Sequence, residues 1–197
     1  GIHFFLTGLI GIVMRPSMEA LMGGIRLGTF DFLLTKPADS QLLASAQVMA
    51  PQAVTDVVVG LGVIGYGVSQ LGVTLSLADL GLFLIMLLAG LVIVYSFLLL
   101  LSTCAFWFVK LDNILVIFQA LFGNAGRWPV TIFPGWLRAL LTFAVPVAFA
   151  VTVPAQALTG QLDLGTALLA IGVAVVFFVA ARVFWLFALR HYTGASA

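Results

Sequence analysis

Long runs without a charged side chain constrain this sequence more than any other feature. No Asp, Glu, Lys or Arg occurs in residues 57–78, 80–109, 139–162 or 164–181. A helix needs about 20 mostly apolar residues to cross a hydrocarbon core, and each run meets or approaches that length. Hydrophobic residues make up 63% of the chain and charged residues only 8%, against about 25% charged residues in soluble domains. The sequence therefore predicts an all-α, polytopic transmembrane helical bundle.

The scarcity of charge and the spacing of the reactive residues exclude several functions. Eight Lys and Arg residues oppose seven Asp and Glu residues, so no basic surface can neutralise a row of phosphates, and we expect no nucleic-acid partner. Lys36 and Lys110 follow Thr35 and Val109, so neither lysine belongs to the Gly-Lys-Ser/Thr turn of a phosphate-binding loop. We expect no catalytic residue, no metal site and no cofactor in this chain.

Four membrane helices are predicted, and the first residues are expected to end another one. The four are 43–71, 79–108, 111–127 and 165–189, and the partial helix is 1–14. We treat 1–197 as a single transmembrane domain that is incomplete at its N-terminus, because it begins with Gly1 rather than Met. The many glycines of 46–72 predict close packing of that helix on another helix.

The basic residues predict the orientation of the chain. The links 72–78 and 159–164 contain no Lys or Arg, whereas Arg182 and Arg190 lie near the C-terminus. Cytoplasmic loops carry an excess of Lys and Arg. We therefore expect both links to be external and the C-terminus to be cytoplasmic.

Residues 110–160 fit two topologies. In the first, 137–158 spans the membrane, as hydropathy and the positions of Arg127 and Arg138 favour. In the second, 111–127 spans and 128–158 forms an external re-entrant region. Four prolines within this region favour the second topology, because each removes an amide donor and restricts the residue before it.

The connection 15–40 is the only sizeable one with a distinctive sequence. Ser17 is expected to cap a short helix that has Glu19 in its first turn and ends at Gly23 and Gly24. Asp39 is expected to cap the next membrane helix. Phe30 and Phe32 then form an apolar knob beside Asp31 and Lys36. Such a segment suits docking into a groove of a water-soluble partner, and it equally suits lying on the lipid headgroups.

Three segments resemble one family of membrane proteins. Residues 28–37, GTFDFLLTKP, resemble the G-x-[LF]-D-x-L-L-x-[KR]-P signature of a subgroup of ABC-2 type transporter permeases. Residues 128–138, WPVTIFPGWLR, resemble a second block of that subgroup, and the W-x-x-A-L-R-H-Y-T-G-A ending at 185–195 resembles its C-terminus. The three blocks occur in order over nearly the whole chain.

The resemblance implies a six-helix permease with a type V exporter-like fold, in the bacterial cytoplasmic membrane. It implies that 15–40 is the coupling loop that contacts a separate ABC ATPase, which binds ATP and Mg²⁺. It also implies a second, related permease half and a re-entrant 128–158. The residues expected in the coupling contact are Arg15, Ser17, Glu19, Arg26, Phe30, Asp31, Phe32 and Lys36.

Three polar residues of the predicted membrane region could line a substrate pathway. Asp56 and Gln52 belong to the predicted 43–71 helix, and Gln119 to the predicted 111–127 helix. A charged side chain at mid-membrane is costly, so Asp56 should face protein or water. The simpler reading, a polar residue at the wetter end of its helix, is favoured. The chain is thus predicted to be the permease subunit of an ABC exporter, and the alternative is a membrane anchor or scaffold that docks a cytoplasmic protein.

Overall fold

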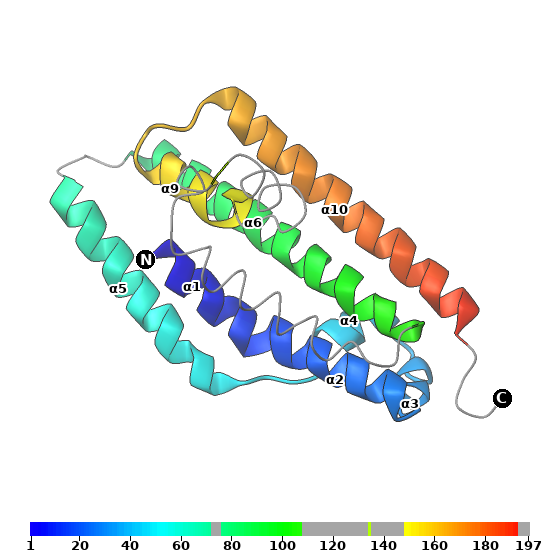
Figure 1. Cartoon of the computed structure of the whole chain (residues 1–197). Helices are drawn as coiled ribbons and strands as arrows, with labels where there is room; N and C mark the ends of the chain where they lie inside the picture. The colour runs from blue at the N-terminus through cyan, green and yellow to red at the C-terminus, as the bar shows by residue number, and fades with distance from the viewer. Residues whose placement is uncertain (72–75, 108–133, 135–147, 193–197) are drawn as a thin grey trace.

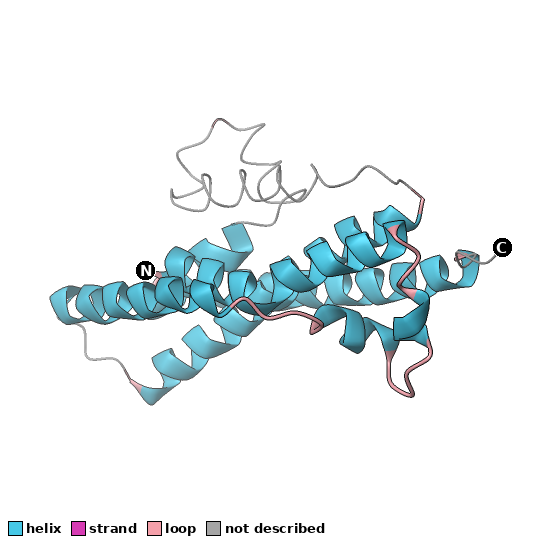
Figure 2. Ribbon diagram, turned by 90° about the horizontal axis from the view of Figure 1, so that it is seen from below, coloured by secondary structure: helices cyan, strands magenta, loops and turns pink. Residues whose placement is uncertain are grey.

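The computed structural model describes residues 1–71, 76–107, 134 and 148–192. All regular secondary structure within these ranges is helical, and the long helices lie side by side in an elongated bundle (Figures 1 and 2). Among the described residues, four helices are long and apolar enough to cross a membrane: Ile2–Arg26, Pro51–Gln70, Leu77–Phe106 and Leu164–His191. The predicted all-α, polytopic architecture is confirmed.

The first helix continues past residue 14, where the sequence predicted a loop. Helix α1 (Ile2–Leu9) passes through a π-helical turn (Ile10–Met14) into α2 (Arg15–Arg26). Pro16 lacks the amide that would bind the Ile12 carbonyl four residues earlier. That carbonyl instead accepts a hydrogen bond from the Ala50 amide at 2.8 Å. The helix therefore tolerates the proline because another segment binds the free acceptor.

Helix α2 also continues beyond Gly23 and Gly24, so the predicted end was too early. Gly28 has a φ of 72° and reverses the chain after α2, which suits a residue without a Cβ. Two short helices follow, α3 (Asp31–Leu34) and α4 (Ser40–Ser45). Asp39 does cap a helix, because its side chain accepts hydrogen bonds from the amides of Gln41 and Leu42, but that helix is the short α4 and not the predicted membrane helix.

The predicted 43–71 span is wrong over its first part. After α4 ends, residues 46–50 are not helical, and a 3-10 turn (Pro51–Ala53) leads into α5 (Val54–Leu71). Ser17 holds the intervening segment: its Oγ donates to the Val48 carbonyl at 3.1 Å and accepts from the Val48 amide at 3.3 Å. Ser17 therefore binds a crossing segment and does not cap a helix.

Helices α1 and α5 pack through glycines. A Cβ at Gly60 would lie 2.4 Å from the Phe5 amide nitrogen, and a Cβ at Gly8 would lie 2.6 Å from the Val57 amide nitrogen. These backbones meet only because neither glycine has a side chain. The predicted close packing is confirmed at Gly60, whereas a Cβ at Gly62 would meet nothing within 4 Å.

Helices α6 (Leu77–Thr103) and α10 (Leu164–His191) form the second pair. Ser76 and Asp79 form a capping box that begins α6, and Asp163 caps α10 by accepting from the Thr166 amide. Alanines recur at helical spacing on the side of α10 that is buried in the bundle: Ala167, Ala170, Ala174, Ala181 and Ala188. This small-residue stripe allows α10 to lie close to its neighbour.

Only the last part of the expected re-entrant region is described. A π-helical turn (Ala148–Thr152) and helix α9 (Val153–Leu158) pack along α6. A Cβ at Gly90 of α6 would lie 2.8 Å from the Cα of Ala150, which is fully buried. The predicted 111–127 span, Arg127 and Arg138 lie outside the described residues, so both topologies of 110–160 stay predictions.

The bundle has two distinct ends. Helices α3 and α4 lie at the same end as the C-terminal ends of α6 and α10 (Figure 1). We call this the loop end. The N-terminal ends of α6 and α10 and helix α9 lie at the opposite end (Figure 1).

Candidate functional site

The loop end joins residues that are far apart in the sequence. We call residues 27–45, which comprise α3, α4 and the turns beside them, the cap. The cap packs on the last turns of α6 and on the C-terminal half of α10 through an aromatic cluster and a polar network.

Phe30 anchors the cap. Its side chain is only 2% exposed and makes edge-to-face ring contacts with Phe106, Trp185 and Tyr192, at centroid distances of 5.4, 6.0 and 5.5 Å. Phe106 belongs to the 3-10 turn that follows α6 (Cys104–Phe106), Trp185 belongs to α10, and Tyr192 follows α10. The expectation that Phe30 presents itself to a partner protein is therefore wrong, because the ring is enclosed by its own chain.

Arg182 of α10 binds the start of α4. Its Nη1 donates to Asp39 Oδ1 at 3.1 Å, and its Nη2 donates to Asp39 Oδ2 at 2.6 Å. Nη1 also donates to Gln41 Oε1 at 2.9 Å. The paired bonds of a guanidinium and a carboxylate fix both distance and orientation.

The network continues from α4 to α6. Gln41 Nε2 donates to the Tyr95 hydroxyl at 3.0 Å, and that hydroxyl lies 2.7 Å from Ser45 Oγ. On the other side of α4, Trp185 Nε1 donates to Ser40 Oγ at 3.2 Å. Through Ser40, Gln41 and Ser45, α4 is therefore hydrogen-bonded to both long helices of the second pair.

Two titratable groups of the cap region have shifted pKa values. The hydrogen bond from Arg182 lowers the pKa of Asp39, although partial burial opposes the shift. Burial raises the pKa of Tyr192, and a hydrogen bond to Asp31 adds to the increase. At neutral pH, Asp39 is therefore ionised and Tyr192 keeps its proton.

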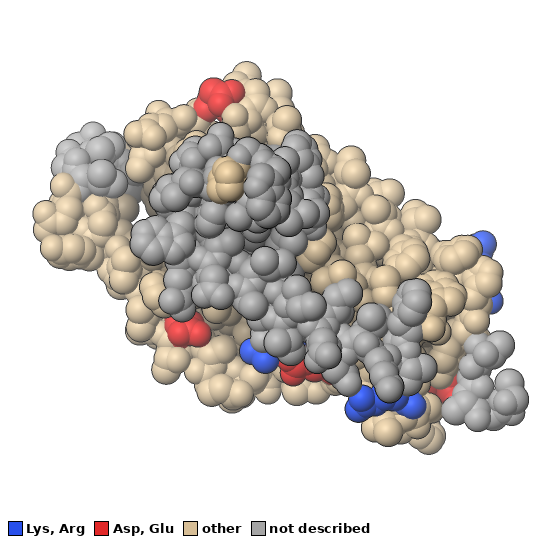
Figure 3. Space-filling view, in the orientation of Figure 1, with Lys and Arg blue, Asp and Glu red and all other residues tan. Residues whose placement is uncertain are grey.

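The outer side of the cap is apolar and exposed. Phe32 is 74% exposed and Leu27 is 73% exposed. Arg26 and Lys36 are also exposed, and on the face shown in Figure 3 basic side chains extend from the middle of the bundle to the loop end. The predicted knob is therefore formed by Phe32 and not by Phe30.

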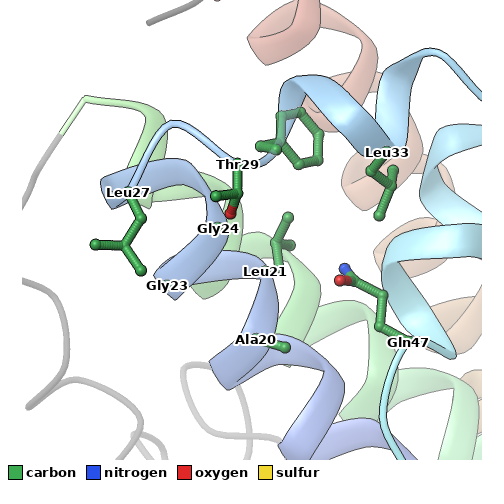
Figure 4. Close-up of a pocket in the computed structure, with 9 residues that line it drawn as sticks. Ala20, Leu21, Gly23, Gly24, Leu27, Thr29, Leu33 and Gln47 are labelled. Carbon is green, nitrogen blue, oxygen red and sulfur yellow. The ribbon is translucent and has the colours of Figure 1, made fainter.

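A groove of about 340 Å³ lies between the end of α2 and the cap (Figure 4). A Cβ at Gly23 would meet nothing within 4 Å, so the wall is open there. The lining is mostly apolar: Ala20, Leu21, Gly23, Gly24, Leu27, Thr29, Phe30, Leu33 and Gln47. The space is large enough for one or two apolar side chains of another protein.

The other predicted coupling residues are more dispersed. Arg15 and Glu19 form an exposed ion pair of 2.8 Å one turn apart on α2, and Ser17 is buried against the 46–50 segment. Sequence analysis missed the roles of Gln41, Tyr95 and Trp185. One feature of the sequence could have identified Arg182 as important: it is the only charged residue between 164 and 189.

The structure describes two of the three predicted pathway residues, Gln52 and Asp56. Gln52 is exposed in the turn before α5, and Asp56 is half-buried in the first turn of α5. An acidic side chain in the first turn is stabilised by the helix dipole. Gln119 lies outside the described residues, so the pathway role of these three stays a prediction. Among the described residues, no group of three His, Cys, Asp or Glu could hold a metal ion.

Comparison with known proteins gives a family. The model of a family described as ABC-2 family transporter protein matches residues 1–196. No curated protein matches the chain, and no solved structure matches it.

Proposed function

The chain belongs to the ABC-2 family of transporter proteins, and from this premise we propose that it is the permease subunit of an ATP-driven exporter. A separate ATPase subunit binds ATP and Mg²⁺ and docks on the cap. A second, related permease subunit completes the substrate pathway. The complex lies in the bacterial cytoplasmic membrane, with the loop end and the C-terminus in the cytoplasm.

The exposed apolar surface of the cap carries this proposal. Leu27 and Phe32 of the cap are about three-quarters exposed at the loop end of the bundle. Burying a leucine or phenylalanine side chain contributes about 1.5–3 kcal/mol each. An apolar knob beside an open groove fits a protein partner, whose side chains can fill the groove while covering the knob.

The rigid attachment of the cap supports a mechanical role. Phe30 is enclosed by rings of α6 and α10, and α4 is bonded to both helices. A push on Phe32 therefore acts on the helices and does not merely deform a loop. If the ATPase binds one arrangement of the helices more tightly in its ATP-bound state, that difference in affinity drives the change between inward and outward access.

Site-specific photo-crosslinking tests the docking. A photoreactive amino acid replaces Phe32 in the full-length protein, and crosslinked partners from native membranes are identified by mass spectrometry. The matched control carries the probe at Leu77, which is 90% exposed at the opposite end of the bundle. We expect an ATPase with a phosphate-binding loop to crosslink to position 32 and not to position 77.

The same experiment distinguishes the alternative function. A membrane scaffold would crosslink at position 32 to a protein that lacks a phosphate-binding loop. That result, or purified complexes without ATP hydrolysis, would overturn the exporter proposal.

A further inference from the structure

Arg182 is an unusual residue in its helix. It is the only charged residue between 164 and 189, within a helix long and apolar enough to cross a membrane. A charge in such a helix is costly unless it faces a partner or water. Its partner here is not on a neighbouring membrane helix but in the cap, 143 positions earlier in the chain.

Asp39 has two roles at once. Its Oδ1 accepts the amides of Gln41 at 3.0 Å and Leu42 at 3.2 Å, and so begins α4. The same carboxylate accepts both Nη atoms of Arg182. Asp39 therefore joins the N-terminus of α4 to Arg182 in the C-terminal half of α10. Neither helix can move unless this ion pair breaks or the other helix moves with it.

The side-chain hydrogen bonds described for the cap reach α6 and α10 but not α5. Gln41 and Tyr95 link the network to α6, whereas α5 packs mainly on α1. The helix pair α6 and α10 therefore follows the cap, and α5 is the natural reference against which their movement can be measured.

We propose that the pair Arg182 and Asp39 is the contact through which movement of the cap reaches α10, so that Arg182 is a positioning residue for transport. The inference rests on the proposed docking of an ATPase on the cap. It identifies the contact at which movement of the cap is passed to a membrane helix.

Distances between spin labels test this contact in the assembled complex of permease and ATPase. Nitroxide labels are placed on α10 at Leu164 and on α5 at Tyr66, which are 76% and 68% exposed. Cys104, the only cysteine, is first replaced by serine. Pulsed electron resonance then compares the nucleotide-free complex with the complex trapped by ATP and vanadate. In the otherwise unchanged protein we expect the distance distribution to shift on trapping.

Three variants of the pair separate transmission from folding. Arg182→Met removes the charge while suiting an apolar helix. Asp39→Asn breaks the ion pair, but asparagine is as suitable as aspartate at the N-terminal capping position of α4. We expect each to abolish the distance shift while the ATPase still co-purifies and hydrolyses ATP. The double variant should be no worse than either single variant, because both remove the same contact. Arg190→Met, exposed on the same helix, is the matched control and should retain the shift.

The outcomes distinguish this inference from the proposed function. If the shift persists in Arg182→Met and Asp39→Asn, the inference is wrong and the exporter proposal stands. If the effects of the single variants add in the double variant, the residues act separately and the inference is also wrong. If the unaltered complex contains no ATPase or shows no shift, the proposed function fails and the inference fails with it.

Discussion

At the scale of single residues, Phe30 and Phe32 have opposite environments although they are only two positions apart. Phe30 is 2% exposed and Phe32 is 74% exposed. We expect Phe30→Ala to lower the free energy of unfolding by about 3–5 kcal/mol, as for other enclosed phenylalanines. Phe32→Ala should change it by less than about 0.5 kcal/mol. Thermal unfolding of the purified protein in detergent measures both.

The two variants should have the opposite order of effect on ATPase binding, which Phe32→Ala should weaken more than Phe30→Ala does. Phe32→Ala should weaken co-purification of the ATPase while the permease stays folded. Equal loss of stability in both variants would contradict the buried position of Phe30.

The ion pair of Asp39 has a defined pH dependence. Its pKa is below the ordinary value because Arg182 donates hydrogen bonds to the carboxylate. Because the pKa of Asp39 is lower in the folded state than in the unfolded state, its ionised carboxylate stabilises the fold at pH values above the unfolded-state pKa. This contribution is lost as the pH falls through the folded-state pKa. The difference in melting temperature between the unaltered protein and Asp39→Asn should therefore be constant from about pH 8 to about pH 5 and shrink below about pH 4. A difference that already declines near pH 6 would show that another group is responsible.

At the scale of elements, the seam between α1 and α5 depends on close backbone approaches at Gly8 and Gly60, and the approach at Gly60 is the shorter. A Cβ at Gly60 would lie 2.4 Å from backbone of α1, whereas a Cβ at Gly62 would meet nothing within 4 Å. We expect Gly60→Ala to separate the helices and lower the melting temperature. Gly62→Ala should be neutral or stabilising, because alanine is favoured over glycine by about 1 kcal/mol inside a helix. Similar melting temperatures for the two variants would disprove the close seam.

The elements also show which predictions the sequence supports. Uncharged length was enough to predict helices at the positions of α6 and α10. Asp39 was correctly predicted to cap a helix, but the helix is the short α4 and not a membrane helix. The helix through Pro16 could not be predicted, because the partner of the Ile12 carbonyl, the Ala50 amide, lies 38 positions later in the chain. The burial of Phe30 was missed for the same reason: its enclosing rings come from residues 106, 185 and 192.

At the scale of the whole molecule, the two ends of the bundle should lie on opposite sides of the membrane. Phe32 and Leu164 are both strongly exposed, at the loop end and at the opposite end. In a Cys104→Ser background, we expect cysteine at position 32 to react with a membrane-impermeant maleimide only after the cells are opened. Cysteine at position 164 should react in intact spheroplasts. The reverse pattern would contradict the orientation and, with it, the docking of a cytoplasmic ATPase.

The seam between α1 and α5 also bears on how the protein is made. Its two helices are joined by fewer than fifty residues, and both close approaches, Gly8 to Val57 and Gly60 to Phe5, lie within the first third of the chain. The hairpin can therefore close in the bilayer while the ribosome is still translating α6. Helix α10, in contrast, receives its partner Asp39 from a segment synthesised long before it. The contact between α10 and the cap can therefore form only after residue 182 has been synthesised, and a protein truncated before that residue would lack it.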